Sequence, residues 1–268
     1  MKSNILYHIF LALATLVTLT LKEAIFPPYD ESLLISIILS EIPYSASLFI
    51  ILLSHEMGHY VPARYYGIDS TLPYFIPMPF GPIGTMGAVI KINEPIPDKK
   101  KLFDIGIGGP LMSFILSIPC WIIGIYYSEL IEIKEIANPD SLILGDSLFT
   151  YYSVQMVHGP YNPDTFDIMI HPLARAGWVG FVITAINLLP FGQLDGGHII
   201  YALFGEKYRN WLYYLLVIFL FMGFVNFSWV IWGIIIYFLI KVEHPFVPDS
   251  NLELGRSRVF LGWFMLIS

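Results

Sequence analysis

Two histidines and a glutamate in the stretch S-H-E-M-G-H-Y have the spacing of a metal site. His55 and His59 are four residues apart, so on a helix both imidazoles lie on one face and can reach the same ion. Glu56 directly follows the first histidine and can lie beside a water molecule that such an ion activates. The three residues end a strongly apolar run, where ionisable side chains are costly unless they pair or coordinate a ligand. This setting favours a functional metal site over a chance motif in a structural helix.

A catalytic zinc ion usually has three protein ligands, so a third ligand should come from another apolar segment. The segment N-L-L-P-F-G-Q-L-D-G-G-H, Asn187 to His198, offers Asp195 between a leucine and two glycines. Pro190 and Gly192 interrupt a helix there and let the chain turn inward. Taken alone, an aspartate in D-G-G is more often a turn residue than a ligand. The two-histidine half-site reverses this preference, and Asp195 becomes the predicted third ligand.

The composition is typical of a membrane protein. Of the 268 residues, 56% are hydrophobic and 13% are charged, and the mean hydropathy is +0.67. Soluble domains have about 45–50% apolar and about 25% charged residues. The net charge of −7, without a basic stripe, does not indicate a nucleic-acid partner. The single cysteine, Cys120, leaves no possibility of a disulfide within the chain.

Six apolar segments approach the roughly 20 residues that a helix needs to cross a bilayer. They are predicted at about 5–24, 32–63, 104–127, 172–189, 209–225 and 228–241. The second is too long for one straight span, and Pro43 should either kink it or separate an interfacial helix at 32–41.

A stretch rich in proline and glycine follows the second segment and cannot form a long helix. Within it, Ala88 to Ile92 is predicted to be a short strand, and the glycines before it let the backbone approach another chain. The stretch is too apolar for a plain solvated loop, which suggests a re-entrant loop enclosed by protein or a water-filled cavity. The predicted fold is therefore an all-α integral membrane protein with about six transmembrane helices and a short re-entrant β-loop between the second and third.

Lysines and arginines are distributed unevenly between the two sides of this predicted topology. Eleven of the 14 fall on the side that holds both termini, and three fall on the other. Cytoplasmic loops carry the excess of basic residues, so both termini are predicted to be cytoplasmic. The H-E-x-x-H motif then lies near the cytoplasmic end of the second span, and the site opens inward.

The two motifs together resemble the site-2 protease family of intramembrane zinc metalloproteases. H-E-M-G-H on one apolar segment and N-L-L-P-F-G-Q-L-D-G-G on a later one carry the resemblance, which also includes G-I-G-G-P-L-M-S-F on the third segment. The run from His171 to His198 resembles the branch found in cyanobacteria, archaea and chloroplasts. We therefore expect a single, compact metalloprotease domain over 1–268, without PDZ or CBS domains, in a prokaryotic cell membrane. Its catalytic core would lie at about 45–200, with an extracytoplasmic insertion at about 128–170.

The resemblance implies a role for each residue of the two motifs. His55, His59 and Asp195 would bind one zinc ion per chain, and Glu56 would be the catalytic base. Asn187 would help to hold the substrate backbone.

The resemblance extends to the loop and the third segment. The stretch from Gly84 to Ile92, including Gly87 and Val89, resembles the family's membrane-re-entrant β-loop, which is proposed to pair with an extended substrate. Ser113 stands where many members have asparagine, which puts in doubt one polar contact in the core but not the metal site.

Two further histidines have open interpretations. His198 follows Asp195 by three residues and could either orient a ligand through a hydrogen bond or cap the next helix. His244 has no partner pattern and is interpreted as structural.

The expected activity is hydrolysis of peptide bonds within or near transmembrane segments of membrane-protein substrates, as in regulated intramembrane proteolysis. Zinc can lower the pKa of bound water to about 7, and Glu56 could pass the released proton to the departing amine. An unwound substrate could pair with a strand edge near Val89. The expected partners are thus substrate transmembrane segments and the lipid bilayer.

Three other functions stay open at this point. An inactive relative that binds clients without cutting them is disfavoured by the intact Glu56. A metal transporter would need polar sites across the bilayer, whereas these residues cluster at one predicted depth. The third is another type of membrane H-E-x-x-H protease. Such a protease would use a glutamate as its third ligand, so the aspartate of the D-G-G motif disfavours it. Substrate identity and oligomeric state do not follow from the sequence.

Overall fold

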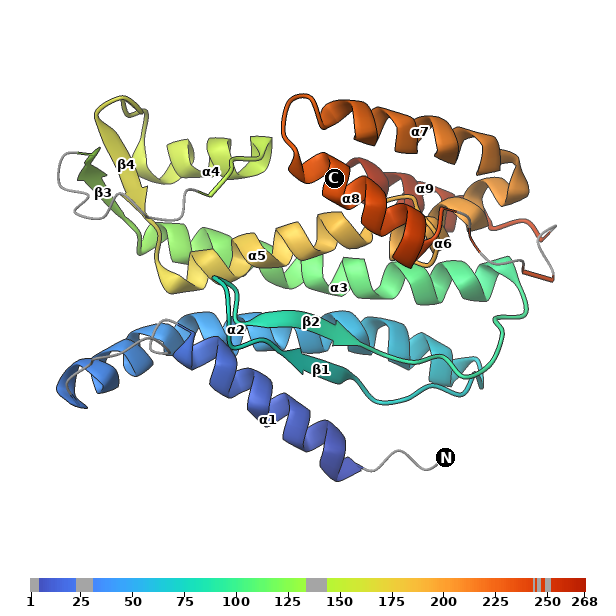
Figure 1. Cartoon of the computed structure of the whole chain (residues 1–268), viewed down its shortest axis with the longest axis horizontal. Helices are drawn as coiled ribbons and strands as arrows, with labels where there is room; N and C mark the ends of the chain where they lie inside the picture. The colour runs from blue at the N-terminus through green and yellow to red at the C-terminus, as the bar shows by residue number, and fades with distance from the viewer. Residues whose placement is uncertain (1–4, 23–30, 134–143, 243, 245–246, 249–251) are drawn as a thin grey trace.

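The computed structural model describes residues 5–22, 31–133, 144–242, 244, 247–248 and 252–268. In these ranges the chain is mostly helical, and its longest helices lie side by side along the long axis, with two small two-stranded sheets beside them (Figure 1). Residues 23–24 of the first predicted span and 134–143 of the predicted insertion lie outside these ranges.

Six of the helices coincide with the predicted apolar segments. The helices are α1 (Ile5–Leu21), α2 (Glu31–Tyr65), α3 (Lys99–Tyr126), α4 (Leu148–His158), α5 (Pro172–Asn187), α6 (Asp195–Phe204), α7 (Arg209–Met222), α8 (Ser228–Ile235) and α9 (Arg256–Ile267), with short helical turns at Gly205–Tyr208 and Ile236–Ile240. By length and composition, α2 and α3 are able to cross a membrane, while α1 and the helix around α8 are apolar but shorter. The six-span topology itself stays a prediction.

Helix α2 continues without a break through Pro43, so the predicted alternative of a separate helix at 32–41 is wrong. A proline inside a helix costs about 3 kcal/mol because one backbone hydrogen bond is lost. Directly after it, Tyr44, Leu48 and Leu52 are buried in a cluster that includes residues of α1 and α5. Burial of this face stabilises the helix by more than the proline costs.

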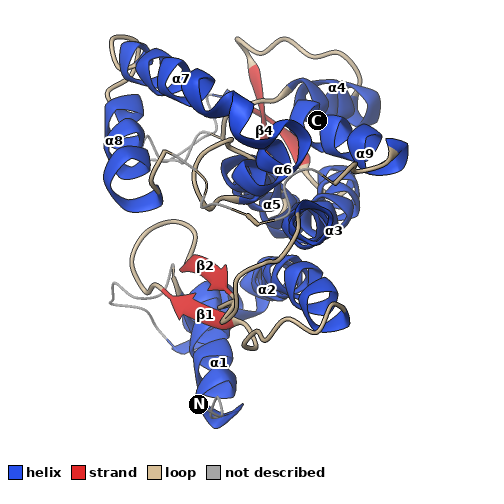
Figure 2. Cartoon of the chain, turned by 90° about the vertical axis from the view of Figure 1, so that its right-hand side faces the viewer, coloured by secondary structure: helices blue, strands red, loops and turns tan. Residues whose placement is uncertain are grey.

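Glycines bring α2, α3 and α5 into close contact. A Cβ atom on Gly58 of α2 would collide with the backbone of Gly108 in α3, and the reverse also holds. Gly177 and Gly180 of α5 face the backbone and side chain of α3 in the same way. Small residues at such positions let helix backbones approach closely. Helix α3 therefore lies against both α2 and α5 (Figures 1 and 2).

The Pro/Gly-rich stretch contains a β-hairpin rather than one strand. β1 (Tyr74–Pro77) pairs antiparallel with β2 (Thr85–Val89), with Tyr74 opposite Val89. The predicted strand at 88–92 thus begins earlier, and its partner strand was not predicted. The hairpin packs on α1 and runs beside α2 (Figure 2). The second edge of β2 has no strand partner within the described chain.

The predicted insertion contains a second two-stranded sheet as well as a helix. β3 (Glu129–Glu132) pairs antiparallel with β4 (Phe166–Met169), at the end of the molecule where α3 ends and α5 begins (Figure 1). Helix α4 comes between the two strands in the chain and packs through Val154 against Trp121 of α3 and Ala174 of α5. Short helices were predicted here, but the sheet was not.

An ion cluster ties three helices together at the same end of the molecule. The carboxylate of Glu41 in α2 pairs with Lys22, just after α1, and with Arg175 in α5. The side chains of Lys22 and Glu41 are 2% and 5% exposed. Both cations also lie over the ring of Tyr44, at 4.0 and 4.6 Å from its centroid. Pairing with the two cations lowers the cost of burying the Glu41 carboxylate.

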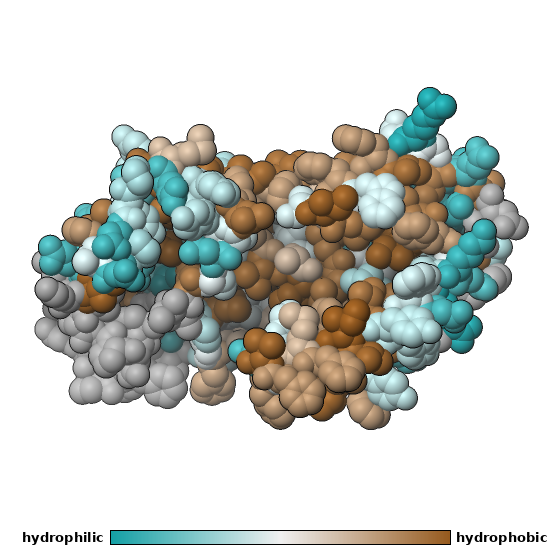
Figure 3. Space-filling view, turned by 90° about the horizontal axis from the view of Figure 1, so that it is seen from above, coloured by the Kyte–Doolittle hydropathy of each residue, from teal (hydrophilic) through white to brown (hydrophobic). Residues whose placement is uncertain are grey.

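The polarity of the surface differs between the middle of the molecule and its two ends. In Figure 3 a hydrophobic band crosses the middle of the molecule, and hydrophilic groups gather toward both ends. This pattern fits the long apolar helices α2 and α3, which run through that middle part.

Candidate metal centre

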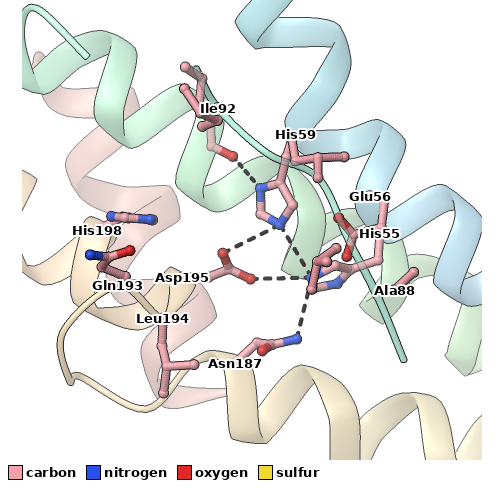
Figure 4. Close-up of a pocket in the computed structure, with 13 residues that line it drawn as sticks. His55, Glu56, His59, Ala88, Ile92, Asn187, Gln193, Leu194, Asp195 and His198 are labelled. Atoms are coloured by element: carbon pink, nitrogen blue, oxygen red, sulfur yellow. Dashed lines mark hydrogen bonds and ion pairs between the residues drawn. The ribbon is translucent and has the colours of Figure 1, made fainter. Parts of the chain in front are cut away.

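The three predicted metal ligands come together from two separate helices (Figure 4). His55 and His59 lie one turn apart near the end of α2, and Asp195 is the first residue of α6. The turn between α5 and α6 brings Asp195 to the histidines, and Gly196 and Gly197 allow it to be tight, since a Cβ on either would collide with the backbone of that turn. All three ligands are at most 9% exposed.

The spacing of the three donor atoms suits a tetrahedral metal ion. The Nε2 atoms of the two histidines are 3.2 Å apart, and carboxylate oxygens of Asp195 lie 3.2 Å from His55 Nε2 and 3.3 Å from His59 Nε2. Ligand bonds of about 2.0–2.2 Å around tetrahedral zinc imply donor separations of about 3.3–3.5 Å. The nitrogen and oxygen donors present thus fit zinc in both type and spacing.

Each histidine is also held by its second ring nitrogen. His59 Nδ1 lies 2.7 Å from the carbonyl oxygen of Ile105 in α3, and only a glycine at position 109 leaves room for this ring. His55 Nδ1 lies 3.0 Å from the hydroxyl oxygen of Ser113. Metal-binding histidines commonly have such a partner, which leaves Nε2 to the metal.

Ser113 therefore contacts a predicted metal ligand, so the polar contact that its departure from the family pattern put in doubt lies beside the predicted metal site. Its hydroxyl is fully buried and also lies 2.7 Å from the hydroxyl of Thr184 in α5, so the pair connects α3, α5 and His55. No spacing rule links a residue of one helix to a histidine 58 positions earlier, and sequence reasoning could not find this contact.

Glu56 lies in the same pocket as the three ligands and is 6% exposed. The pocket wall opposite α2 includes Ala88, Val89 and Ile90 of the hairpin. The backbone of Ile90, the residue after β2, faces the Glu56 carboxylate. The carbonyl of Lys91 accepts the N–H of Thr71, and backbone groups alternate along an extended chain, so Val89 faces the β1 side while Ala88 and Ile90 face the unpaired edge.

Asn187 is the last residue of α5 and reaches the same pocket. Its side-chain nitrogen lies 3.4 Å from His55 Nε2 (Figure 4). An amide at this position faces both the ligands and the space that a substrate backbone would fill.

The two predicted loop glycines lie away from the pocket lining. Gly84 has a φ of 88° and packs against the backbone of α1, where a Cβ would lie 2.9 Å from Leu19 Cα. Gly87 has a φ of 97° and open space around it. Both allow the hairpin to turn and twist, while Val89 lies in the pocket wall.

His198 lines the pocket, but its hydrogen-bond partner is a residue that sequence reasoning set aside. Its Nδ1 lies 2.6 Å from Nε2 of His244, which comes from the chain after α8. Within the described residues, the His198 ring makes no hydrogen bond to a predicted metal ligand. Because the two histidines are 46 positions apart, no local sequence motif predicts this pair.

A membrane-type helical fold with two histidines, an aspartate and a glutamate in one buried pocket defines a class of membrane-embedded metallohydrolases. A model of peptidase family M50 matches residues 43–223, which is more than half of the chain. The chain belongs to peptidase family M50, and the resemblance to the site-2 proteases is confirmed.

Curated relatives are plant proteins. Over 187 residues the chain is 34% identical to "Probable zinc metalloprotease EGY1, chloroplastic" of Oryza sativa subsp. japonica, covering 67% of this chain and 31% of the relative. It is 31% identical over 192 residues to the protein of the same name from Arabidopsis thaliana, covering 69% and 33%. A third, "Probable zinc metalloprotease EGY2, chloroplastic" of Arabidopsis thaliana, is 28% identical over 218 residues, covering 77% and 38%. The chain thus spans about a third of the length of these relatives.

Proposed function

We propose that this protein is a membrane-embedded zinc metalloprotease that hydrolyses peptide bonds within or near the transmembrane segments of other membrane proteins. The observation that carries the proposal is the convergence of His55, His59 and Asp195 at tetrahedral spacing, with Glu56 in the same pocket. Membership of a peptidase family and relatives named as zinc metalloproteases support it.

In the proposed site, His55, His59 and Asp195 would hold one zinc ion, with the two Nε2 atoms and a carboxylate oxygen as the available donors. Zinc supplies Lewis acidity, which activates water and polarises a carbonyl group. Ser113 and the Ile105 carbonyl keep the two imidazole rings in the orientation that this binding needs.

Glu56 is the proposed proton carrier. Its carboxylate accepts a proton from the attacking water and donates it to the amine that leaves when the peptide bond breaks. Ile90 of the pocket wall faces this carboxylate beside the ligands. Asn187 is close enough to the ligands to bind a carbonyl oxygen of the substrate with its side-chain nitrogen.

We propose that an extended segment of the substrate binds along the free edge of β2. A peptide bond inside a helix is shielded by its own hydrogen bonds, so the substrate must unwind before it is cut. Along the edge, Ala88 and Ile90 direct backbone groups toward the pocket and can replace the hydrogen bonds that unwinding breaks. Recognition would then rest on the substrate main chain.

The proposed placement is an integral membrane protein with several spans, a re-entrant β1–β2 hairpin and both termini in the cytoplasm. The apolar helices α2 and α3 and the hydrophobic band in Figure 3 support it. A single domain with its core at about 45–200 and an extracytoplasmic unit of β3, α4 and β4 completes the proposal. A prokaryotic cell membrane stays a prediction, and the relatives are named chloroplastic.

The test measures zinc content and cleavage of a model single-span substrate by the detergent-purified protein. The wild type should hold about one zinc ion per chain and cut the substrate. Glu56→Gln should keep zinc and lose about 10²–10⁴-fold in cleavage rate, because the general base is removed. Asp195→Ala should bind zinc more weakly and also lose cleavage. Glu132→Gln, at an exposed carboxylate of β3, is the matched control and should behave as wild type.

Four results would overturn the proposal. A wild-type protein that holds no metal would remove its chemical basis, and an active Asp195→Ala would remove the third ligand. Retention of substrate without cleavage by the zinc-loaded wild type would favour a client-binding relative instead. Metal uptake into vesicles that contain the protein would favour a transporter.

A further inference from the structure

The chain after α8 folds back against the turn that carries Asp195. Among the described residues, Lys241 is the one non-glycine with a positive φ, 66°, and it stands where the helical turn Ile236–Ile240 ends. With a ψ of 148°, this residue lies in a region of backbone space that side chains other than glycine rarely occupy, so its backbone is strained. Contacts that the reversed chain makes offset this backbone strain. They involve four residues, here called the return segment: Lys241, Val242, His244 and Val247.

The first contact is between backbones. The N–H of Gly192 donates to the carbonyl oxygen of Val242 at 3.2 Å. Gly192 has a φ of 52°, and a Cβ there would collide with the carbonyl oxygens of Ile240 and Lys241. Gly192 precedes Asp195 by three residues, so the return segment touches the turn that positions the third ligand.

The second contact involves side chains on α6. His244 Nε2 lies 2.6 Å from His198 Nδ1, and its ring packs on Tyr201 with the centroids 4.5 Å apart. The hydroxyl of Tyr201 accepts the backbone N–H of Val247 at 3.3 Å. Tyr201 is 3% exposed. His198 and Tyr201 face the return segment from the first two turns of the helix that Asp195 begins.

We propose that His244 is a positioning residue of the metal centre, which acts through His198 to fix the first turn of α6 and with it the Asp195 carboxylate. The inference rests on the proposed function, because it takes Asp195 as a metal ligand. The family match ends at residue 223, so this support lies outside the matched part of the chain. One proton is shared between the two imidazoles, and this hydrogen bond also fixes the orientation of His198 in the pocket wall.

The test compares variants of the full chain, purified in detergent, by competition for zinc with a chromophoric chelator. His244→Phe keeps a ring on Tyr201 but removes the hydrogen bond to His198, and we expect its zinc dissociation constant to rise about tenfold. His244→Gln keeps a donor near the place of Nε2 and should stay close to the wild-type value. His158→Phe is the control, since His158, the last residue of α4, bonds to the Ile125 carbonyl of α3, away from the pocket.

Thermal unfolding and kcat/KM are measured in parallel. A tenfold loss of zinc affinity with an unchanged unfolding temperature identifies positioning rather than general stability. If His244→Phe does not fold, Tyr201→Phe removes only the hydroxyl that accepts the Val247 N–H and should weaken zinc binding in the same direction.

The inference is overturned if zinc binding by His244→Phe, or by Tyr201→Phe where it replaces that variant, equals that of the wild type. It is also overturned if His244→Gln is as weak as His244→Phe, because ring packing would then explain the loss. These failures differ from failure of the proposed function, in which the wild type itself holds no zinc or cuts no substrate.

Discussion

At the scale of single residues, the metal centre depends on neighbours that do not themselves bind metal. Ser113 holds His55, the Ile105 carbonyl holds His59, and the chain around Gly192 holds Asp195. Each ligand is thus fixed by a different element. A metal site with preset ligands loses less rotamer freedom on binding, which strengthens it.

Ser113→Ala tests this arrangement. The change removes one hydroxyl from a fully buried site and leaves His55 Nδ1 without the partner that orients the ring. We expect zinc affinity to fall about tenfold, measured by chelator competition. Ser117→Ala is a close match, because Ser117 is equally buried one turn further along α3 and its hydroxyl makes no hydrogen bond within the described residues. Equal affinities in the two variants would contradict the role of Ser113.

At the scale of elements, the position of α3 against α2 decides whether these contacts exist. The backbones touch at Gly58 and Gly108, one residue before His59 and one before Gly109. A displacement of α3 here would move the Ile105 carbonyl and Ser113 away from both histidines. The precision of the site therefore depends on two positions that carry no side chain.

Gly58→Ala should disturb this contact. Its new methyl group would meet the Gly108 carbonyl, and overpacking of this kind costs about 1–3 kcal/mol of unfolding free energy. We expect a lower unfolding temperature in detergent together with weaker zinc retention. Gly145→Ala, where no atom lies within 4 Å of the new Cβ, should leave both quantities unchanged. A stable Gly58→Ala that retains zinc normally would show that α3 can shift without harm.

At the scale of the whole molecule, the proposed orientation puts the two ends on opposite sides of a membrane. Lys207 lies in the turn before α7, and Asp164 lies in the turn before β4, at opposite ends of the long axis (Figure 1). Both are exposed, so a cysteine at either position can react with a maleimide that does not cross membranes.

On a Cys120→Ser background, we expect Asp164→Cys to react in intact cells and Lys207→Cys to react only after the membrane is permeabilised. The excess of lysine and arginine on the predicted cytoplasmic side is the physical reason. Reaction of both cysteines in intact cells would refute the proposed topology.

The sequence was informative where the functional residues lie a few positions apart in one motif. The H-E-x-x-H motif and D-G-G identified four residues that the fold then placed in one pocket. Apolar runs located six helices, because burial in a helix needs a long continuous stretch. The strand β1 was missed because prolines dominate its surroundings. The contacts of Ser113 and His244 were not predicted because their partners lie 58 and 46 residues away. Such contacts depend on tertiary packing, which local patterns do not encode.

The ion cluster of Lys22, Glu41 and Arg175 has a consequence for biosynthesis. Lys22 and Glu41 are 19 residues apart and leave the ribosome together, whereas Arg175 is made 134 residues after Glu41. An acidic side chain that enters a bilayer alone is costly, and an early partner lowers that cost. Lys22 can therefore accompany Glu41 while α1 and α2 insert as a pair. Arg175 can pair with Glu41 only after α5 has been inserted. The complete cluster therefore forms only when the helices on both sides of the metal centre have been assembled.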